Sequence, residues 1–178
     1  PYVLSDVKLM NEVERSGGPA QAELEENLSL VRGEAAGHRT HPLSAFVKHK
    51  ALSADLADKV FEATRGWRFQ NGLNQDLAEH PSLGESTISK MLADPATGLA
   101  VRRSLIAHPN STSLHEKEAM RSPLLYAAVA MKQGADPDNL RELYRRYEAN
   151  EGDINHATIS PLWANESTPS DVIDRHVR

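Results

Sequence analysis

The sequence predicts an all-α protein, an α-solenoid built from short helical hairpins. Apolar residues recur at spacings of three and four, which is typical of one buried face of a helix. Alternating strand-like runs bounded by turn residues are almost absent. A phrase also returns after 28 residues: "LAEHPSLGESTISKML" begins at Leu77 and "LIAHPNSTSLHEKEAM" begins at Leu105. Such self-similarity indicates a repeat of one helix–turn–helix unit.

Short helices are expected along the whole chain, and most of them begin at a capping residue or a proline. The first two end at Gly17-Gly18-Pro19 and at Gly37, a third follows His41-Pro42, and a fourth is capped by Ser53 and ends at Gly66. The remaining helices are expected at 68–79, 84–93, 99–107, 113–122, 123–132, 136–149, 156–164 and 168–176.

The links between helices explain why such hairpins would stack. Each link breaks one helix, often with proline, and offers a Ser, Thr, Asn or Asp to cap the next. A single hairpin cannot bury its apolar stripe, whereas stacked hairpins can. The residues expected to face neighbouring helices are Leu56, Ile88, Leu114, Leu140 and Val172.

Two domains are expected. Residues 1–40 are less repeat-like and are interpreted as a helical cap or an appended interaction segment, and residues 41–178 as the helical-repeat domain. A cap is physically required, because an end unit would otherwise expose its apolar face.

Two stretches, "LAEHPSLGESTISKMLADPATGLAVRRSLIAHPNSTS" and "WANESTPSDVIDRHV", resemble the leucine-rich repeat variant (LRV) pattern. This resemblance implies HEAT-like units stacked into a right-handed superhelix. The period here is irregular, His-Pro stands where the family has Asn-Pro, and the cysteine cluster is missing, so an iron–sulfur role is not supported. The matching positions are Val101, Arg102, Leu105, Ala107, Pro109 and Asn110, then Ala164, Asn165, Thr168, Pro169, Asp171 and Val172.

Composition restricts the classes of function and of site. The absence of cysteine excludes disulfides, thiolate metal sites and a cysteine nucleophile. A net charge of −5 argues against nonspecific nucleic-acid binding. No apolar run approaches the roughly 20 residues that span a bilayer, so no membrane insertion is expected. A soluble, cytoplasmic protein is expected by default; the chain begins at Pro1, so secretion with a trimmed leader stays an open alternative.

No motif for a catalytic, cofactor or metal site stands out. The eight histidines suggested a metal hypothesis, but His115 lacks the second histidine four residues later that a zincin requires. His49, His80 and His108 share one place in the repeat, at a helix end. There we expect a partly charged ring to bond free carbonyl groups. No catalytic residue, cofactor or metal is therefore predicted.

Three hypotheses of function remain. The first is a protein–protein interaction scaffold or adaptor, of the kind used by bacterial effectors or immunity proteins. The second is a nucleic-acid-binding repeat of the HEAT-like DNA-repair type, and the third an enzyme with a scattered site. The arginines would hold phosphates or a protein partner, unless nearby carboxylates pair with them; Trp67 would anchor a partner unless it lies in the core. The candidate binding residues are Trp67, Arg102, Arg103, Arg141, Arg145 and Arg146.

Overall fold

The computed structural model describes residues 47–48, 52–66, 70–151 and 154–177, and within these ranges it is all-helical with no strand. The chain divides into two compact units, Pro1–Thr87 and Ile88–Arg178. The expected domain boundary at residue 40 and the three helices before Ser53 lie outside the described residues. The prediction of an all-α protein is therefore confirmed for the described part of the chain.

In the first unit, helices α4 (Ala54–Thr64) and α5 (Gln70–Ala78) pack against each other. The hydroxyl of Ser53 accepts a hydrogen bond from the N–H of Leu56, which confirms the predicted N-cap. The predicted end at Gly66 is also confirmed, since Gly66 has a φ of +80°, which favours glycine.

Helix α6 (Glu85–Ala93) crosses the boundary between the units, and the second unit continues with seven further elements. The helix expected at 99–107 has those bounds, and the others agree to within a few residues at each end. The elements are α7 (Leu99–Ala107), α8 (Ser113–Ala119), the 3-10 turn η1 (Pro123–Leu125) with α9 (Tyr126–Met131), α10 (Pro137–Glu148), α11 (His156–Ile159) with the 3-10 turn η2 (Ser160–Ala164), and α12 (Ser170–His176).

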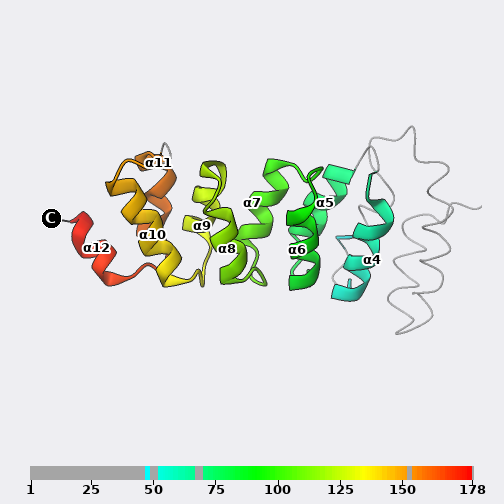
Figure 1. The fold of residues 1–178 in the computed structure, drawn as a ribbon. Helices are drawn as coiled ribbons and strands as arrows, with labels where there is room; N and C mark the ends of the chain where they lie inside the picture. The colour runs from blue at the N-terminus through cyan, green and yellow to red at the C-terminus, as the bar shows by residue number, and fades with distance from the viewer. Residues whose placement is uncertain (1–46, 49–51, 67–69, 152–153, 178) are drawn as a thin grey trace, which may run out of the picture. The chain divides into compact units, whose positions relative to one another are not determined.

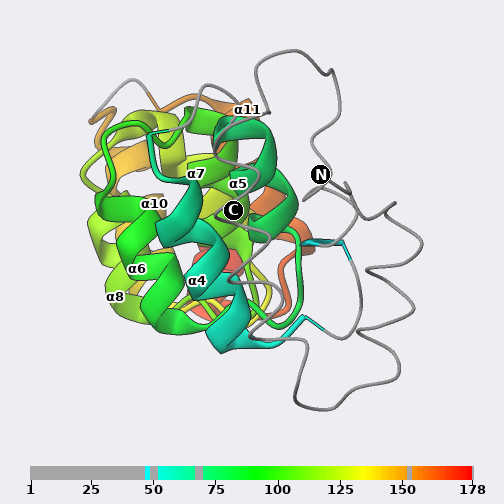
Figure 2. The ribbon, with the colours of Figure 1, turned by 90° about the vertical axis from the view of Figure 1, so that its right-hand side faces the viewer.

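The helices of the second unit form two layers. Helix α9 packs against both α7 and α11, and α8 packs against α10, so that alternate helices are neighbours within a layer (Figure 1). The layers contact each other through α8 and α10, each of which also packs on α9. In Figure 2 α8 and α10 lie to the left of α7 and α11.

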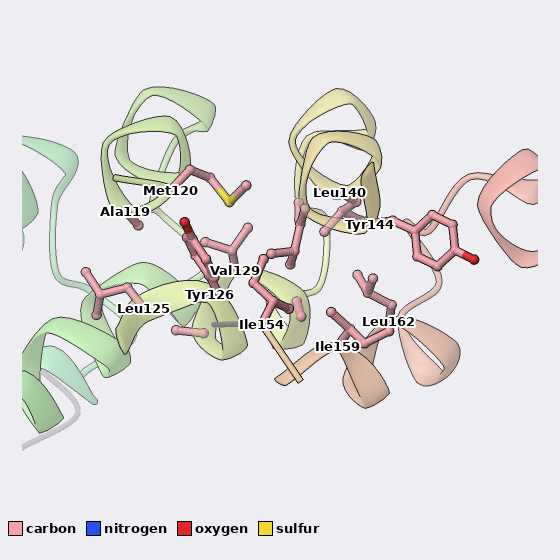
Figure 3. Close-up of a cluster of buried hydrophobic side chains, with 14 of the residues drawn as sticks. Ala119, Met120, Leu125, Tyr126, Val129, Leu140, Tyr144, Ile154, Ile159 and Leu162 are labelled. Atoms are coloured by element: carbon pink, nitrogen blue, oxygen red, sulfur yellow. The ribbon is translucent and has the colours of Figure 1, made fainter. Parts of the chain in front are cut away.

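The core of the second unit lies between these layers. Figure 3 shows Met120 and Leu140 pointing toward Val129 and Ile159 of the opposite layer. All four side chains are buried. Among the residues expected to face neighbours, Ile88, Leu140 and Val172 are buried and Leu56 is half-buried.

The prediction for Leu114 is wrong, because its side chain is 72% exposed. The inward face of α8 consists instead of His115, Glu116 and Ala119. Helix α8 is thus rotated by about one residue from the position that its leucine suggested, since adjacent residues lie about 100° apart on a helix.

The links between helices share one backbone geometry. In each, a link residue donates its N–H to the carbonyl three residues earlier and accepts, at its own carbonyl, the N–H three residues later. The first four link residues are fourteen residues apart, so a pair of helices takes 28 residues, as the repeated phrase suggested. The link residues are His80, Asp94, His108, Ser122, Lys132 and Asn165.

Side chains reinforce four of these links. The side chains of His80, Asp94, His108 and Asn165 each accept a hydrogen bond from the N–H two residues later, at 2.9 to 3.2 Å. A histidine accepts through Nδ1 only when that nitrogen carries no proton. The expected role of a charged ring that donates from Nδ1 is therefore wrong for His80 and His108: in both rings Nδ1 accepts.

Candidate functional site

Arg102, one of the predicted binding residues, is used inside the protein. Its guanidinium donates to the carbonyl oxygens of Leu92, Asp94 and Thr97, at 2.6, 2.7 and 3.0 Å. These carbonyls lie at the end of α6 and in the link that follows it, where the helix has no partners of its own for them. Arg102 therefore closes the α6–α7 link, and its donors are directed away from any ligand.

The three arginines of α10 are paired with carboxylates. Arg141 contacts Asp138 at 2.8 Å and Asp171 at 3.2 Å. Arg145 and Arg146 both contact Glu142 at 2.7 Å, and these hydrogen bonds, that of Arg145 foremost, lower the pKa of Glu142 to about 2. The surface that the nucleic-acid hypothesis requires is thus neutralised by its own acidic residues.

Two of the same arginines make further contacts within the fold. Arg145 contacts Glu151 at 3.0 Å, and its hydrogen bond lowers the pKa of that carboxyl. Arg146 donates to the carbonyl of Met120 at 2.5 Å and to the hydroxyl of Tyr126 at 3.0 Å. Arg146 consequently joins α10 to the elements before it in the chain.

Arg103 differs from the other arginines of the described part. It lies exposed on α7, and its Nε donates to the carbonyl of Leu124 at 3.1 Å. No carboxylate lies within 4.0 Å of it, whereas the other described arginines, Arg102 apart, each pair with one.

Of the two tryptophans, Trp67 lies outside the described residues. Trp163, in η2, is half-buried and stacks on the ring of His176 with the centroids 3.8 Å apart. Tyr144 meets the other side of this pair edge-on, with its centroid 5.9 Å from that of Trp163. This aromatic cluster fastens α12 to α10 and η2.

One serine–histidine pair has the spacing of a catalytic dyad. The Oγ of Ser89 lies 2.7 Å from Nε2 of His115. However, the N–H of Thr112 donates to Nδ1 of His115 at 3.1 Å, so in the neutral ring the proton is on Nε2 and faces the serine. A general base would need a free lone pair there, and this arrangement therefore does not activate Ser89.

A buried ion pair lies beside this histidine. The carboxylate of Glu116 is completely buried and binds the ammonium of Lys132, which is 4% exposed. The same carboxylate accepts from the N–H of Asp136 and from Nδ2 of Asn139, both at 2.9 Å. Lys132 also donates to the carbonyl of Ser111 at 2.7 Å. With every partner supplied internally, the cluster joins α8, α9 and α10 and leaves no site for a ligand.

Metal and membrane sites were sought over the same part of the chain. The described residues hold no group of three or more His, Asp or Glu that could bind a metal ion. Among the described helices, none has both the length and the apolar character needed to cross a bilayer.

The two layers of the second unit present different surfaces. The exposed positions of α6, α8 and α10 carry charged residues of both signs, namely Glu85, Lys90, Lys117, Glu118, Arg121, Asp138, Arg141, Arg145 and Glu148. The opposite layer, formed by α7, η1, α9, α11 and η2, contains no Asp or Glu at all. Arg103 is its one fully exposed formal charge, since Arg102 is half-buried in the link.

We define the uncharged surface as the α7–α9–α11 face. Its outward positions follow one spacing in all three helices: a residue, the next one, then the fourth and the eighth after the first. Leu124 is 59% exposed and Met131 60%, while Leu99 is 36% exposed. The face consists of Leu99, Ala100, Arg103 and Ala107, then Pro123, Leu124, Ala127 and Met131, then His156, Ala157, Ser160 and Ala164.

No protein-family model, no curated protein and no solved structure matched this chain. The geometry of the second unit is therefore the basis for the function proposed below.

Proposed function

We propose that this chain is a protein-binding helical-repeat module and that the α7–α9–α11 face is its binding surface. The observation that carries the proposal is the division of charge between the layers: the acidic residues all lie on one side, and the opposite face has a single exposed charge among aliphatic side chains. Depletion of charge with retention of Met and Arg is typical of the centre of protein interfaces.

The proposal includes an architecture. We propose that the hairpins of the second unit form a short α-solenoid of the HEAT or LRV type. The link that recurs every fourteen residues supports it, as does the alternation of helices between two layers. In such an array one layer of helices supplies a continuous surface for a partner.

The other hypotheses receive less support. Nucleic-acid binding would require several arginines free to neutralise phosphates, and those of α10 are paired with carboxylates. An enzyme would require an activated group, and the proton on Nε2 of His115 faces Ser89. Neither hypothesis has a specific observation in its favour.

Site-specific photo-crosslinking tests the proposal. A photoreactive phenylalanine analogue is placed at Leu124 or at Met131 on the face, and at Leu114, which is more exposed and lies on the charged layer, as the matched control. After irradiation in a lysate of the source organism, we expect a discrete protein adduct from the two face positions and none from position 114. Adducts from all three positions, or from none, would contradict the proposal.

A further inference from the structure

We infer that the partner presents a carboxylate flanked by aliphatic side chains, and that Arg103 binds this carboxylate. The inference rests on the proposed function, because it names the chemistry of the segment that the α7–α9–α11 face would receive.

The first argument is the state of Arg103. Its single hydrogen bond, from Nε to the carbonyl of Leu124, fixes the plane of the guanidinium and leaves the Nη1 and Nη2 donors to the surface. These two nitrogens form a fork that matches the two oxygens of a carboxylate. An orientation fixed in advance also lowers the entropy lost when a ligand binds.

The second argument is charge complementarity. No helix of this layer contains an acidic residue, so the face supplies no counter-charge of its own to Arg103. An interface that covered Arg103 without a carboxylate would bury an unpaired charge, which is costly. A partner that covers the face therefore gains most when it brings the carboxylate itself.

The third argument is the apolar surround. Leu99 lies one turn before Arg103 on the same side of α7, and Leu124 is the residue whose carbonyl Arg103 contacts. Met131 lies two turns beyond Leu124, at the end of α9. Aliphatic residues on both sides of the partner's carboxylate would cover these side chains and would exclude water from the ion pair.

Two other occupants fit the face less well. A second copy of the same face would place Arg103 among further residues without a carboxylate, which leaves both guanidinium groups unpaired. A nucleic acid would meet one cation on this surface, whereas binding to a phosphate backbone draws on several. The observations therefore favour a segment of a different protein.

The experiment is a selection of random twelve-residue peptides displayed on phage against the full chain. Peptides that bind the wild type but lose binding to both Leu124→Asp and Met131→Asp are assigned to the face. Both substituted side chains are more than half exposed, so the variants are expected to fold, which far-UV circular dichroism checks.

We expect face-binding peptides to contain Asp or Glu with Leu, Ile, Val or Met on either side. Replacing the acidic residue by its amide in the peptide should weaken binding about tenfold, as expected for a charge-assisted hydrogen bond. A selection against Arg103→Glu should favour Lys or Arg in place of the acid. The matched control is Arg121→Glu, an exposed arginine on the charged layer, which should leave the preference for acidic peptides unchanged.

The outcomes separate the two proposals. Face-binding peptides that are uncharged or basic, or that ignore Arg103→Glu, would overturn the inference and leave the proposed function intact. A selection that yields no face-binding peptide would overturn both. Sedimentation of the chain alone is expected to show a monomer; a dimer that Leu124→Asp dissociates would assign the face to a second copy and overturn the inference.

Discussion

Replacing Lys132 by methionine tests whether the buried ion pair holds the second unit together. Methionine keeps most of the apolar stem and removes the ammonium. The completely buried carboxylate of Glu116 would keep its hydrogen bonds from Asp136 and Asn139 but lose its counter-charge. The carbonyl of Ser111 would also lose its donor.

The magnitude follows from the burial. Breaking a buried pair by removing one partner costs about 3–5 kcal/mol of unfolding free energy, because an uncompensated charge stays inside. The double variant Glu116→Gln with Lys132→Met removes both charges and should cost only about 1–3 kcal/mol, chiefly for the unsatisfied carbonyl of Ser111. The coupling between the two positions should therefore reach about 2 kcal/mol or more.

Urea unfolding of the full chain at pH 7, followed by far-UV circular dichroism, measures these differences. The matched control is Arg121→Met, which breaks the pair with Glu118 on the surface, where the side chains are 77% and 65% exposed. An exposed pair contributes under about 1 kcal/mol. If Lys132→Met costs no more than this control, or if the double variant is as unstable as the two single variants added together, the reasoning is refuted.

Two further predictions concern the surface carboxylate and the links. Because Arg145 and Arg146 lower the pKa of Glu142 from 4.5 to about 2, its pairing stabilises the folded state above about pH 4.5 and this contribution is lost as the pH falls toward 2. Glu142→Gln should therefore lower the urea midpoint at pH 7 by an amount worth about 0.5–1 kcal/mol, and the gap to the wild type should narrow by pH 3; a constant gap would argue against the assigned pairing. In the link, His108→Asn should retain about 1 kcal/mol more stability than His108→Ala in the same assay, because an amide oxygen can accept the N–H of Asn110 as Asn165 accepts that of Ser167. Equal losses for the two variants would show that this hydrogen bond is not what histidine contributes.

The sequence was sufficient to locate the helices because their ends carry local signals. The helix at Leu99–Ala107 and the cap at Ser53 each depend on a few adjacent residues, such as Gly98 before the helix or the Ser53 hydroxyl. A stronger signal for the repeat was also present: Pro81, Pro95, Pro109, Pro123 and Pro137 are fourteen residues apart. Four of these prolines directly follow a link residue, so their spacing marks the links more regularly than the wider phrase does.

The orientation of α8 could not be predicted from apolar periodicity. A glutamate at a fully buried position is stable only because Lys132, sixteen residues later, supplies the counter-charge, and no local pattern reveals a partner at that distance. Leu114 then takes the exposed position beside it. The same limit applies to the arginines, since Arg102 and Arg103 are neighbours in sequence, yet one closes a link and the other lies on the open face.

The fourteen-residue spacing of the links has a consequence for how such a chain can change length. Helices alternate between the layers, so an insertion or deletion of one helix would exchange the acid-free and the charged side for everything that follows it. A duplication of 28 residues adds one helix to each layer, and the downstream helices keep their sides. Gain or loss of whole pairs is therefore the change in length that preserves the identity of both surfaces.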